Sequence, residues 1–258
     1  MKPSRAVQLL VTLLGCWIGG AASLHAADAA VLYAQHCAQC HGADRLGLMG
    51  PALLPENLKR VRKKSAAKVI AEGRPATQMP PFGTLLDRDA VDALVEMIYT
   101  PLPEIPVWTE TQIEASRKIL VAAADLPGKP LHDADPMNMF IVVELGDHHA
   151  SVLDGDRLEP IHRFKTQYAV HGGPKYSPDG RFVYFISRDG CVSKFDMWSL
   201  QTVAEVRAGI NARNLAVSDD GRYLMVANYL PHTLVLLDAE ELRPVKLIDV
   251  HDDSGKSS

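Results

Sequence analysis

The chain has 258 residues, of which 47% are hydrophobic and 22% are charged, and its formal net charge is -4. This length suggests two domains, and the composition is that of an ordinary globular protein. The small negative charge gives no reason to expect nucleic-acid binding.

Residues 1–27 are typical of an export signal. Lys2 and Arg5 make the start of the chain positive, an apolar run follows, and small residues lead to a cleavage site near Ala26 and Ala27. The apolar run is too short to span a bilayer comfortably. We therefore expect the mature protein to be exported to the periplasm.

An alternative signal overlaps the apolar run. Residues 13–16 read Leu-Leu-Gly-Cys, which resembles a lipoprotein cleavage site and would leave Cys16 as a lipidated N-terminus. The preceding Leu and the apolar residues that follow fit this pattern poorly. Membrane attachment is expected only if Cys16 is lipidated, and either signal takes the protein out of the cytoplasm.

Residues 37–41 read Cys-Ala-Gln-Cys-His, the pattern of covalent c-type haem attachment. The thiols of Cys37 and Cys40 add to the haem vinyl groups, and His41 supplies an axial nitrogen to the iron. A zinc site would need a second Cys/His pair at ligand spacing, and the other two cysteines are far apart. The motif predicts one haem c, which bacteria attach outside the cytoplasm, and it leaves too few cysteines for a disulfide framework.

Residues 28–100 are predicted to form an all-α domain with helices at 29–40, 65–72 and 87–99. Ser65 and Asp87 are expected to cap the second and third helices, and Gly73 to end the second. The predicted core residues are Val31, Leu32 and Tyr33 of the first helix and Val91, Leu94, Val95 and Ile98 of the third.

A second axial ligand is predicted in residues 78–83, Gln-Met-Pro-Pro-Phe-Gly. The prolines restrict the loop, so Met79 can present its thioether to iron at little entropic cost. Met49 is the competitor, eight residues from His41 in a glycine-rich loop. With both motifs present, the domain resembles a class I cytochrome c. His/Met ligation leaves no open position on the iron, so this domain is expected to transfer electrons and not to bind substrate.

Residues 101–138 are predicted to be a proline-rich linker that contains a short helix. Residues 108–124 have a helical pattern, with Ile113, Ile119 and Leu120 on the apolar face, that could pack against either domain.

From residue 139 the pattern changes to short alternating strands separated by Gly, Asp and Pro turns. Residues 177–182, Ser-Pro-Asp-Gly-Arg-Phe, return 41 residues later as Ser-Asp-Asp-Gly-Arg-Tyr at 218–223. A period near 40 with several strands per unit predicts β-propeller blades. Strands are expected at residues 140–144, 150–153, 182–187, 192–196, 223–227 and 233–237.

Residues 139–258 hold about two and a half such blades, fewer than the minimum of about four that a closed propeller needs. An incomplete propeller exposes a blade face and a strand edge. We therefore expect the chain to be part of a longer protein, and completion of the propeller by a partner is the alternative.

Residues 168–171, Tyr-Ala-Val-His, and residues 210–213, Ile-Asn-Ala-Arg, follow a c-type haem domain here. A lone histidine is more often structural, but this combination resembles the cytochrome cd1 family, in which an eight-bladed propeller holds haem d1. The resemblance implies that His171 is an axial ligand of the d1 iron. It also implies that the d1 carboxylates are bound by cations: Arg188, Arg213 and, on a weaker match, Lys175.

Residues 148–149, 153–157 and 171–180 resemble the family's biosynthetic dihydro-haem d1 dehydrogenases more than its nitrite reductases. The resemblance implies oxidation of dihydro-haem d1 to haem d1 for denitrification, with haem c taking the electrons; no catalytic base is assigned. The implied partners are a small cytochrome or cupredoxin, other haem d1 biosynthesis proteins and nitrite reductase. The alternatives are a cd1-type nitrite reductase and an electron-transfer cytochrome c with an inert propeller stub.

Overall fold

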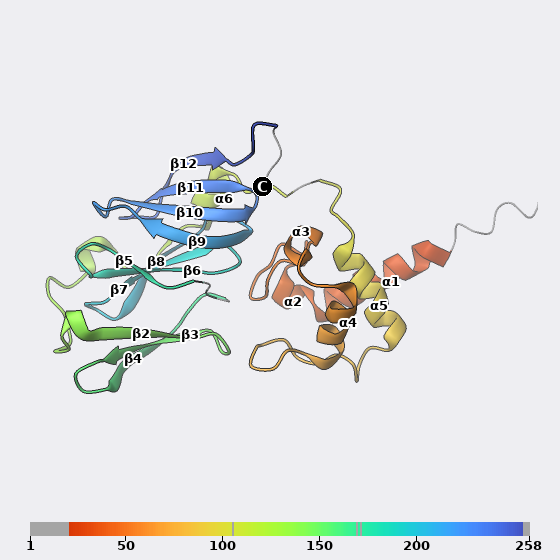
Figure 1. Cartoon of the computed structure of the whole chain (residues 1–258), viewed down its shortest axis with the longest axis horizontal. Coiled ribbons are helices and arrows are strands. Elements are labelled where there is room, and N and C mark those ends of the chain that lie inside the picture. Colours follow the sequence, from red (N-terminus) through yellow and green to blue (C-terminus); the bar gives the residue numbers. More distant parts are fainter. Residues whose placement is uncertain (1–20, 105, 169, 171, 255–258) are drawn as a thin grey trace, which may run out of the picture.

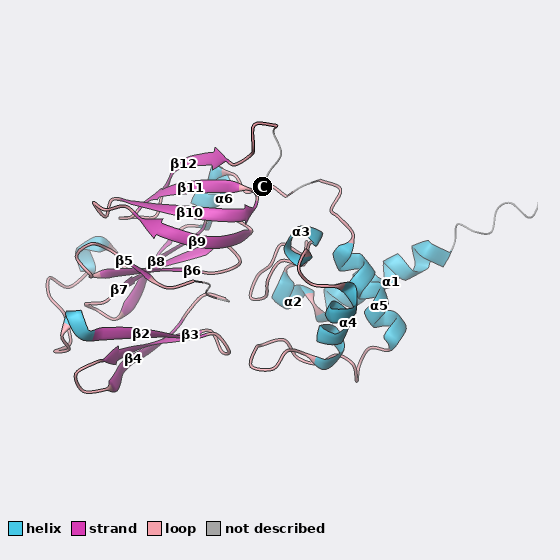
Figure 2. Ribbon diagram, viewed as in Figure 1, coloured by secondary structure: helices cyan, strands magenta, loops and turns pink. Residues whose placement is uncertain are grey.

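The structure is a computed structural model that describes residues 21–104, 106–168, 170 and 172–254. A helical part lies beside a part made of antiparallel sheets, as the ribbon coloured along the chain and the ribbon coloured by secondary structure both show (Figures 1 and 2). We call residues 21–104 the helical part and residues 139–254 the propeller part. The predicted fold class, a cytochrome c-like domain followed by an incomplete β-propeller, is confirmed. The export signal, including Cys16, falls mostly outside the described residues.

Five helices make up the described helical part, and they pack around a core formed mainly by α1, α4 and α5. Asp87 caps α5 by accepting a hydrogen bond from the backbone N of Ala90 at 2.8 Å, and Gly73 ends α4 with φ +72°, as predicted. The four apolar residues predicted on one face of α5 are all buried. The helices are α1 (Ala21–His36), α2 (Ala38–His41), α3 (Pro55–Leu58), α4 (Lys63–Glu72) and α5 (Arg88–Tyr99).

Two details of the helical prediction are wrong. Val31 is 55% exposed, because Ala29 and Tyr33, four residues apart, define the buried face of α1 and Val31 lies on the other side. Ser65 does not cap α4: the helix begins at Lys63, and the backbone N of Ser65 already donates to Arg62 O within the first turn.

The predicted linker helix is also shorter than its pattern indicated. α6 (Glu110–Ser116) is held by a capping box at Thr109 and buries Ile113 in the propeller core. After Ser116 the chain leaves the helix and forms β1 (Lys118–Ile119), which pairs with β8. Ile119 and Leu120 are consequently exposed, since the free edge of β8 competes successfully for their backbone groups.

Three antiparallel sheets form the propeller part. The first has the order β2-β3-β4, the second β1-β8-β7-β6-β5, and the third β12-β11-β10-β9. The six predicted strands correspond to β2, β3, β6, β7, β10 and β11, and the prediction missed the other six. The bounds are β2 (Met139–Glu144), β3 (His149–Asp154), β4 (Glu159–Lys165), β5 (Lys175–Tyr176), β6 (Phe182–Ile186), β7 (Cys191–Asp196), β8 (Gln201–Arg207), β9 (Asn211–Val217), β10 (Tyr223–Leu230), β11 (Thr233–Asp238) and β12 (Pro244–Asp249).

The sequence repeat forms the same turn in both copies. Ser177 Oγ contacts Asp179 Oδ1 and accepts from the backbone N of Phe182 at 2.8 Å, while Gly180 N donates to Ser177 O at 2.9 Å. The second copy repeats these contacts with Ser218, Asp220, Tyr223 and Gly221. The turn directly precedes β6 in the first copy and β10 in the second, the second strands of the runs β5–β8 and β9–β12, which is what a repeating blade unit requires.

Candidate functional site

The two motif cysteines lie where α1 passes into α2. The backbone N of Cys37 donates to Tyr33 O at 2.8 Å, and the backbone N of His41 donates to Cys37 O at 2.9 Å, so helical turns continue through the motif. Cys37 and Cys40 are both free and partly buried. Burial, with a further contribution from Cys40, raises the pKa of the Cys37 thiol to about 11.

His41 is held in the orientation that an iron ligand needs. The side chain is buried, and its Nδ1 lies 2.8 Å from Pro51 O, so Nδ1–H donates and Nε2 keeps its lone pair for a metal. Burial lowers the pKa of His41, although the hydrogen bond to Pro51 O acts in the opposite direction. The lowered pKa favours the neutral ring, the form that binds a metal. A Cβ at Gly50 would stand 2.7 Å from the His41 ring, so this glycine is required. The sequence prediction named neither Gly50 nor Pro51.

The methionine loop is positioned by Gly73. A Cβ there would meet Pro81 N at 2.8 Å and Met79 O at 2.9 Å, and φ is +72°, so only glycine lets the loop pass so closely. Met79 packs against the same apolar core as Cys37, whereas Met49 is not among the residues of that core. This arrangement supports Met79 over Met49 as the second axial ligand.

These residues fit haem c. Two thiols, a histidine with a free Nε2 and a methionine that packs on the same core as Cys37 would provide the attachment points and both axial ligands. No cluster of three or more His, Cys, Asp or Glu side chains suited to a metal ion occurs among the described residues. Likewise, no described helix is long and apolar enough to cross a membrane.

The predicted haem d1 cations lie at the ends of propeller strands. Lys175 begins β5 and donates to Gly173 O at 3.2 Å. Arg188 follows the end of β6, and Arg213 lies near the start of β9. Arg188 O accepts from the backbone N of Ala212 at 3.2 Å, which brings the two arginines together. His171, the ligand implied for the d1 iron, lies outside the described residues.

The charge of Arg74, in the helical part, also acts on Arg188. The pKa of Arg188 is lowered by burial first, then by the charges of Arg213 and Arg74. Guanidinium groups whose charges act on one another in this way favour binding of carboxylates. Arg74 was not predicted, because it is 114 positions from Arg188 in the sequence.

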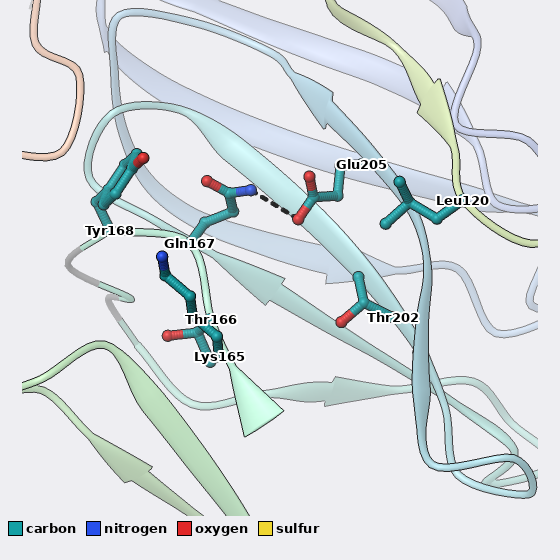
Figure 3. Close-up of a pocket in the computed structure, with 7 residues that line it drawn as sticks. All are labelled: Leu120, Lys165, Thr166, Gln167, Tyr168, Thr202 and Glu205. Atoms are coloured by element: carbon teal, nitrogen blue, oxygen red, sulfur yellow. Dashed lines mark hydrogen bonds between the residues drawn. The ribbon is translucent and has the colours of Figure 1, made fainter. Parts of the chain in front are cut away.

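A small pocket lies between β8 and the segment that follows β4 (Figure 3). Its volume is about 280 Å³, and Gln167 Nε2 donates to Glu205 Oε1 at 2.7 Å across it. It contains none of the predicted haem d1 cations and is too small for a tetrapyrrole. The pocket is lined by Leu120, Lys165, Thr166, Gln167, Tyr168, Thr202 and Glu205.

Both axial-ligand loops of the helical part contact the propeller part. On the histidine side, Arg207 Nη2 donates to Leu46 O at 2.8 Å. On the methionine side, Gln78 Nε2 donates to Gly146 O at 3.1 Å, in the turn between β2 and β3. An apolar junction beside the histidine loop consists of Ala52, Leu54, Ile210 and Leu230.

Two family models match the chain. The cytochrome D1 heme domain matches residues 134–258, and cytochrome c oxidase, cbb3-type, subunit III matches residues 25–98. Together they cover the propeller part and most of the helical part.

Individual proteins match over longer stretches. A dihydro-heme d1 dehydrogenase of Pseudomonas aeruginosa is 53% identical over 98% of this chain and 51% of its own length. A nitrite reductase of Stutzerimonas stutzeri is 27% identical over 84% of this chain and 42% of its own. A solved structure titled dihydro-heme d1 dehydrogenase NirN in complex with DHE is 55% identical, covers 90% of this chain and 50% of that one, and gives a TM-score of 0.82.

The chain spans about half the length of the curated relatives it matches. Within that span, a cytochrome c part is followed by a haem d1 part, in the order found from the motifs. The chain belongs to the cytochrome cd1 family.

Proposed function

We propose that this chain takes part in oxidising dihydro-haem d1 to haem d1 in the periplasm, with its haem c receiving the electrons. The observation that carries the proposal is the junction between the two parts. Both predicted axial-ligand loops contact the blades through Leu46 and Gln78, and the charge of Arg74 acts on Arg188 in the propeller part. An electron acceptor is thereby placed beside a cationic group suited to the carboxylates of the substrate.

The residues have distinct roles in this proposal. The carboxylates of the substrate pair with four cationic side chains: Arg74, Arg188, Arg213 and Lys175. By analogy with the family, His171 ligates the iron of the substrate. Oxidation removes two electrons and two protons from the propionate side chain of the substrate. Haem c supplies a one-electron acceptor, held by the two cysteines, His41 and Met79. A periplasmic cytochrome or cupredoxin must therefore reoxidise it between the two electrons.

Binding and electron transfer can be tested together in the chain carrying covalent haem c. Anaerobic addition of dihydro-haem d1 is expected to change the visible spectrum of the ligand and to reduce ferric haem c. Arg74→Gln should weaken binding, whereas Arg88→Gln should not, because Arg88 is exposed on α5 and pairs locally with Asp92 at 3.8 Å.

The other family readings give different outcomes in the same experiment. If neither dihydro-haem d1 nor haem d1 binds, the proposal is overturned for this chain, and electron transfer by haem c alone remains. Nitric oxide formation from nitrite, with haem d1 bound and no reaction of dihydro-haem d1, would instead identify a nitrite reductase.

A further inference from the structure

Arg207, at the end of β8, is fixed by contacts from three directions. Its Nε donates to Asp189 O at 2.8 Å and Gly209 O at 3.0 Å, and its Nη2 donates to Leu46 O at 2.8 Å. The guanidinium carbon lies 4.8 Å from the centre of the Trp108 ring, and Trp108 Nε1 donates to Arg207 O at 2.8 Å. The guanidinium therefore joins the blade, the linker and the helical part.

The carbonyl that Arg207 holds belongs to the loop that orients His41. The backbone N of Gly47, the next residue, donates to His41 O at 2.9 Å, and the same loop supplies Pro51 O to His41 Nδ1 at 2.8 Å. On its other side, the loop is pressed against the propeller part at the apolar junction defined above. Arg207 thus holds the loop that bonds both the backbone carbonyl and the imidazole of His41.

We propose that Arg207 is a positioning residue for His41 and thereby sets the reduction potential of haem c. A firm Nδ1–H···O bond makes the imidazole a more basic ligand. A more basic ligand favours ferric over ferrous iron, so Arg207 keeps the potential lower than a looser loop would. The inference rests on the proposed ligation of haem c by His41, but it does not require dehydrogenase activity.

The test is Arg207→Lys in the full chain with covalent haem c. Lysine keeps the charge, but one ammonium group cannot reach the three carbonyls that the guanidinium binds. In a spectroelectrochemical titration, the ferrous-to-ferric ratio at the wild-type midpoint is expected to rise about threefold to tenfold, where tenfold corresponds to 59 mV for one electron. The electron paramagnetic resonance spectrum of the ferric haem should change as well, since it reports the orientation of axial ligands.

Arg181→Lys is the matched control in the same blade. Arg181 donates to Asp196 Oδ1 at 2.9 Å and to Pro127 O at 3.0 Å, and it stacks 4.0 Å from the Trp198 ring. This change keeps the charge and weakens contacts in a part of the blade that does not contact the histidine loop. The ferrous-to-ferric ratio should therefore stay at the wild-type value. An unchanged ratio in Arg207→Lys, or an equal rise in Arg181→Lys, would overturn the proposal.

A second variant serves if Arg207→Lys does not fold. Trp108→Phe removes the Nε1 donor to Arg207 O but keeps an aromatic ring beside the guanidinium. The ferrous-to-ferric ratio is therefore expected to rise, but by less than in Arg207→Lys. No rise in this variant would also overturn the proposal. If the wild-type chain carried no covalent haem, the haem c site itself would be contradicted. This outcome is distinct from a failure of the proposal for Arg207.

Discussion

The helical and propeller parts use their polar and cofactor-binding residues in different ways. In the helical part, the residues that would hold haem c come from two short stretches, and Cys37 and Met79 pack partly buried on a small apolar core. In the propeller part, two buried charged groups have protein partners: Asp196 is fully buried and pairs with Arg181, and buried Lys194 donates to Ala239 O at 2.9 Å. We infer that the helical part depends on its cofactor and the propeller part on its own hydrogen bonds.

The largest expected effect follows from removing the haem attachment. The double variant Cys37→Ser and Cys40→Ser should retain no haem on a denaturing gel, because no thioether can form. Its helical circular-dichroism signal should melt at lower temperature, while the sheet signal stays near that of wild type.

Cys191→Ser is the control for that variant, since Cys191 lies in β7 and is also a free, partly buried thiol. It should retain covalent haem in full. Haem on the gel in the double variant, or equal loss of sheet and helix signals, would contradict the difference drawn between the two parts.

Replacing the second axial ligand tests the helical part more finely. Met79→Ala should retain covalent haem but lose the weak sulfur-to-iron absorbance at the red end of the spectrum. The reduction potential should also fall, because the thioether favours ferrous iron, and axial ligands set haem potentials over about 0.8 V. Met49→Ala should change neither property. The reverse result would assign the ligand to Met49.

The prediction from sequence succeeded where the decisive pattern is local. The c-type haem motif, Asp87 as the cap of α5 and the repeated Ser-x-Asp-Gly-Arg turn are all readable within a few residues, and the structure has the cap and the turn as predicted. It failed for strands such as β8, whose Gln, Ala and Glu residues give no clean alternation.

Contacts between segments that are distant in the sequence could not be predicted from it either. Residues 118–121 have helical spacing, but the free edge of β8 makes them extended. The contact from Arg207 to Leu46 joins residues 161 positions apart, and no local pattern indicates it. The haem c ligands therefore remain predictions made from local sequence, whereas the junction beside them could not be predicted in that way.

A third prediction concerns the buried ion pair between Asp196 and Arg181 in the propeller part. Asp196 accepts from Arg181 Nε at 2.9 Å and from Ser199 Oγ at 2.8 Å while fully buried. Asp196→Ala leaves a largely buried guanidinium unpaired and should cost about 3–5 kcal/mol of unfolding free energy. Urea unfolding followed by the sheet circular-dichroism signal measures this, with haem retained.

Asp238, at the equivalent position of the next blade, is the matched control. It accepts from the backbone N of Glu241 at 2.7 Å and of Arg243 at 2.6 Å, and no arginine of the described residues forms an ion pair with it. Asp238→Ala should cost less, about 1.5–3 kcal/mol, because it removes hydrogen bonds to a charged group without leaving a buried charge unpaired. Equal losses for both variants would show that the buried pair has no special weight.

The smallest expected effect concerns acid titration of the repeated turn. The pKa of Asp220 is lowered to about 2, first by the hydrogen bond from Ser218 and then by the backbone and side chain of Arg222. The carboxylate thus contributes stability above its unfolded pKa of about 3.9, and that contribution is lost as the pH falls toward 2. It is small because the group is exposed to solvent.

Carbon NMR of the aspartate carboxyls measures this titration directly. The midpoint for Asp220 should lie near 2 in the wild type and move toward about 3.9 in Ser218→Ala, because the largest stabilising hydrogen bond is removed. Ser177→Ala should also raise the pKa of Asp179 in the preceding blade, where burial already opposes the downward shift. A wild-type Asp220 midpoint near 3.9 would show that the turn does not hold its carboxylate as the hydrogen bonds indicate. If Ser177→Ala moved Asp179 while Ser218→Ala left Asp220 unchanged, the two copies of the turn would share their shape but not their electrostatics.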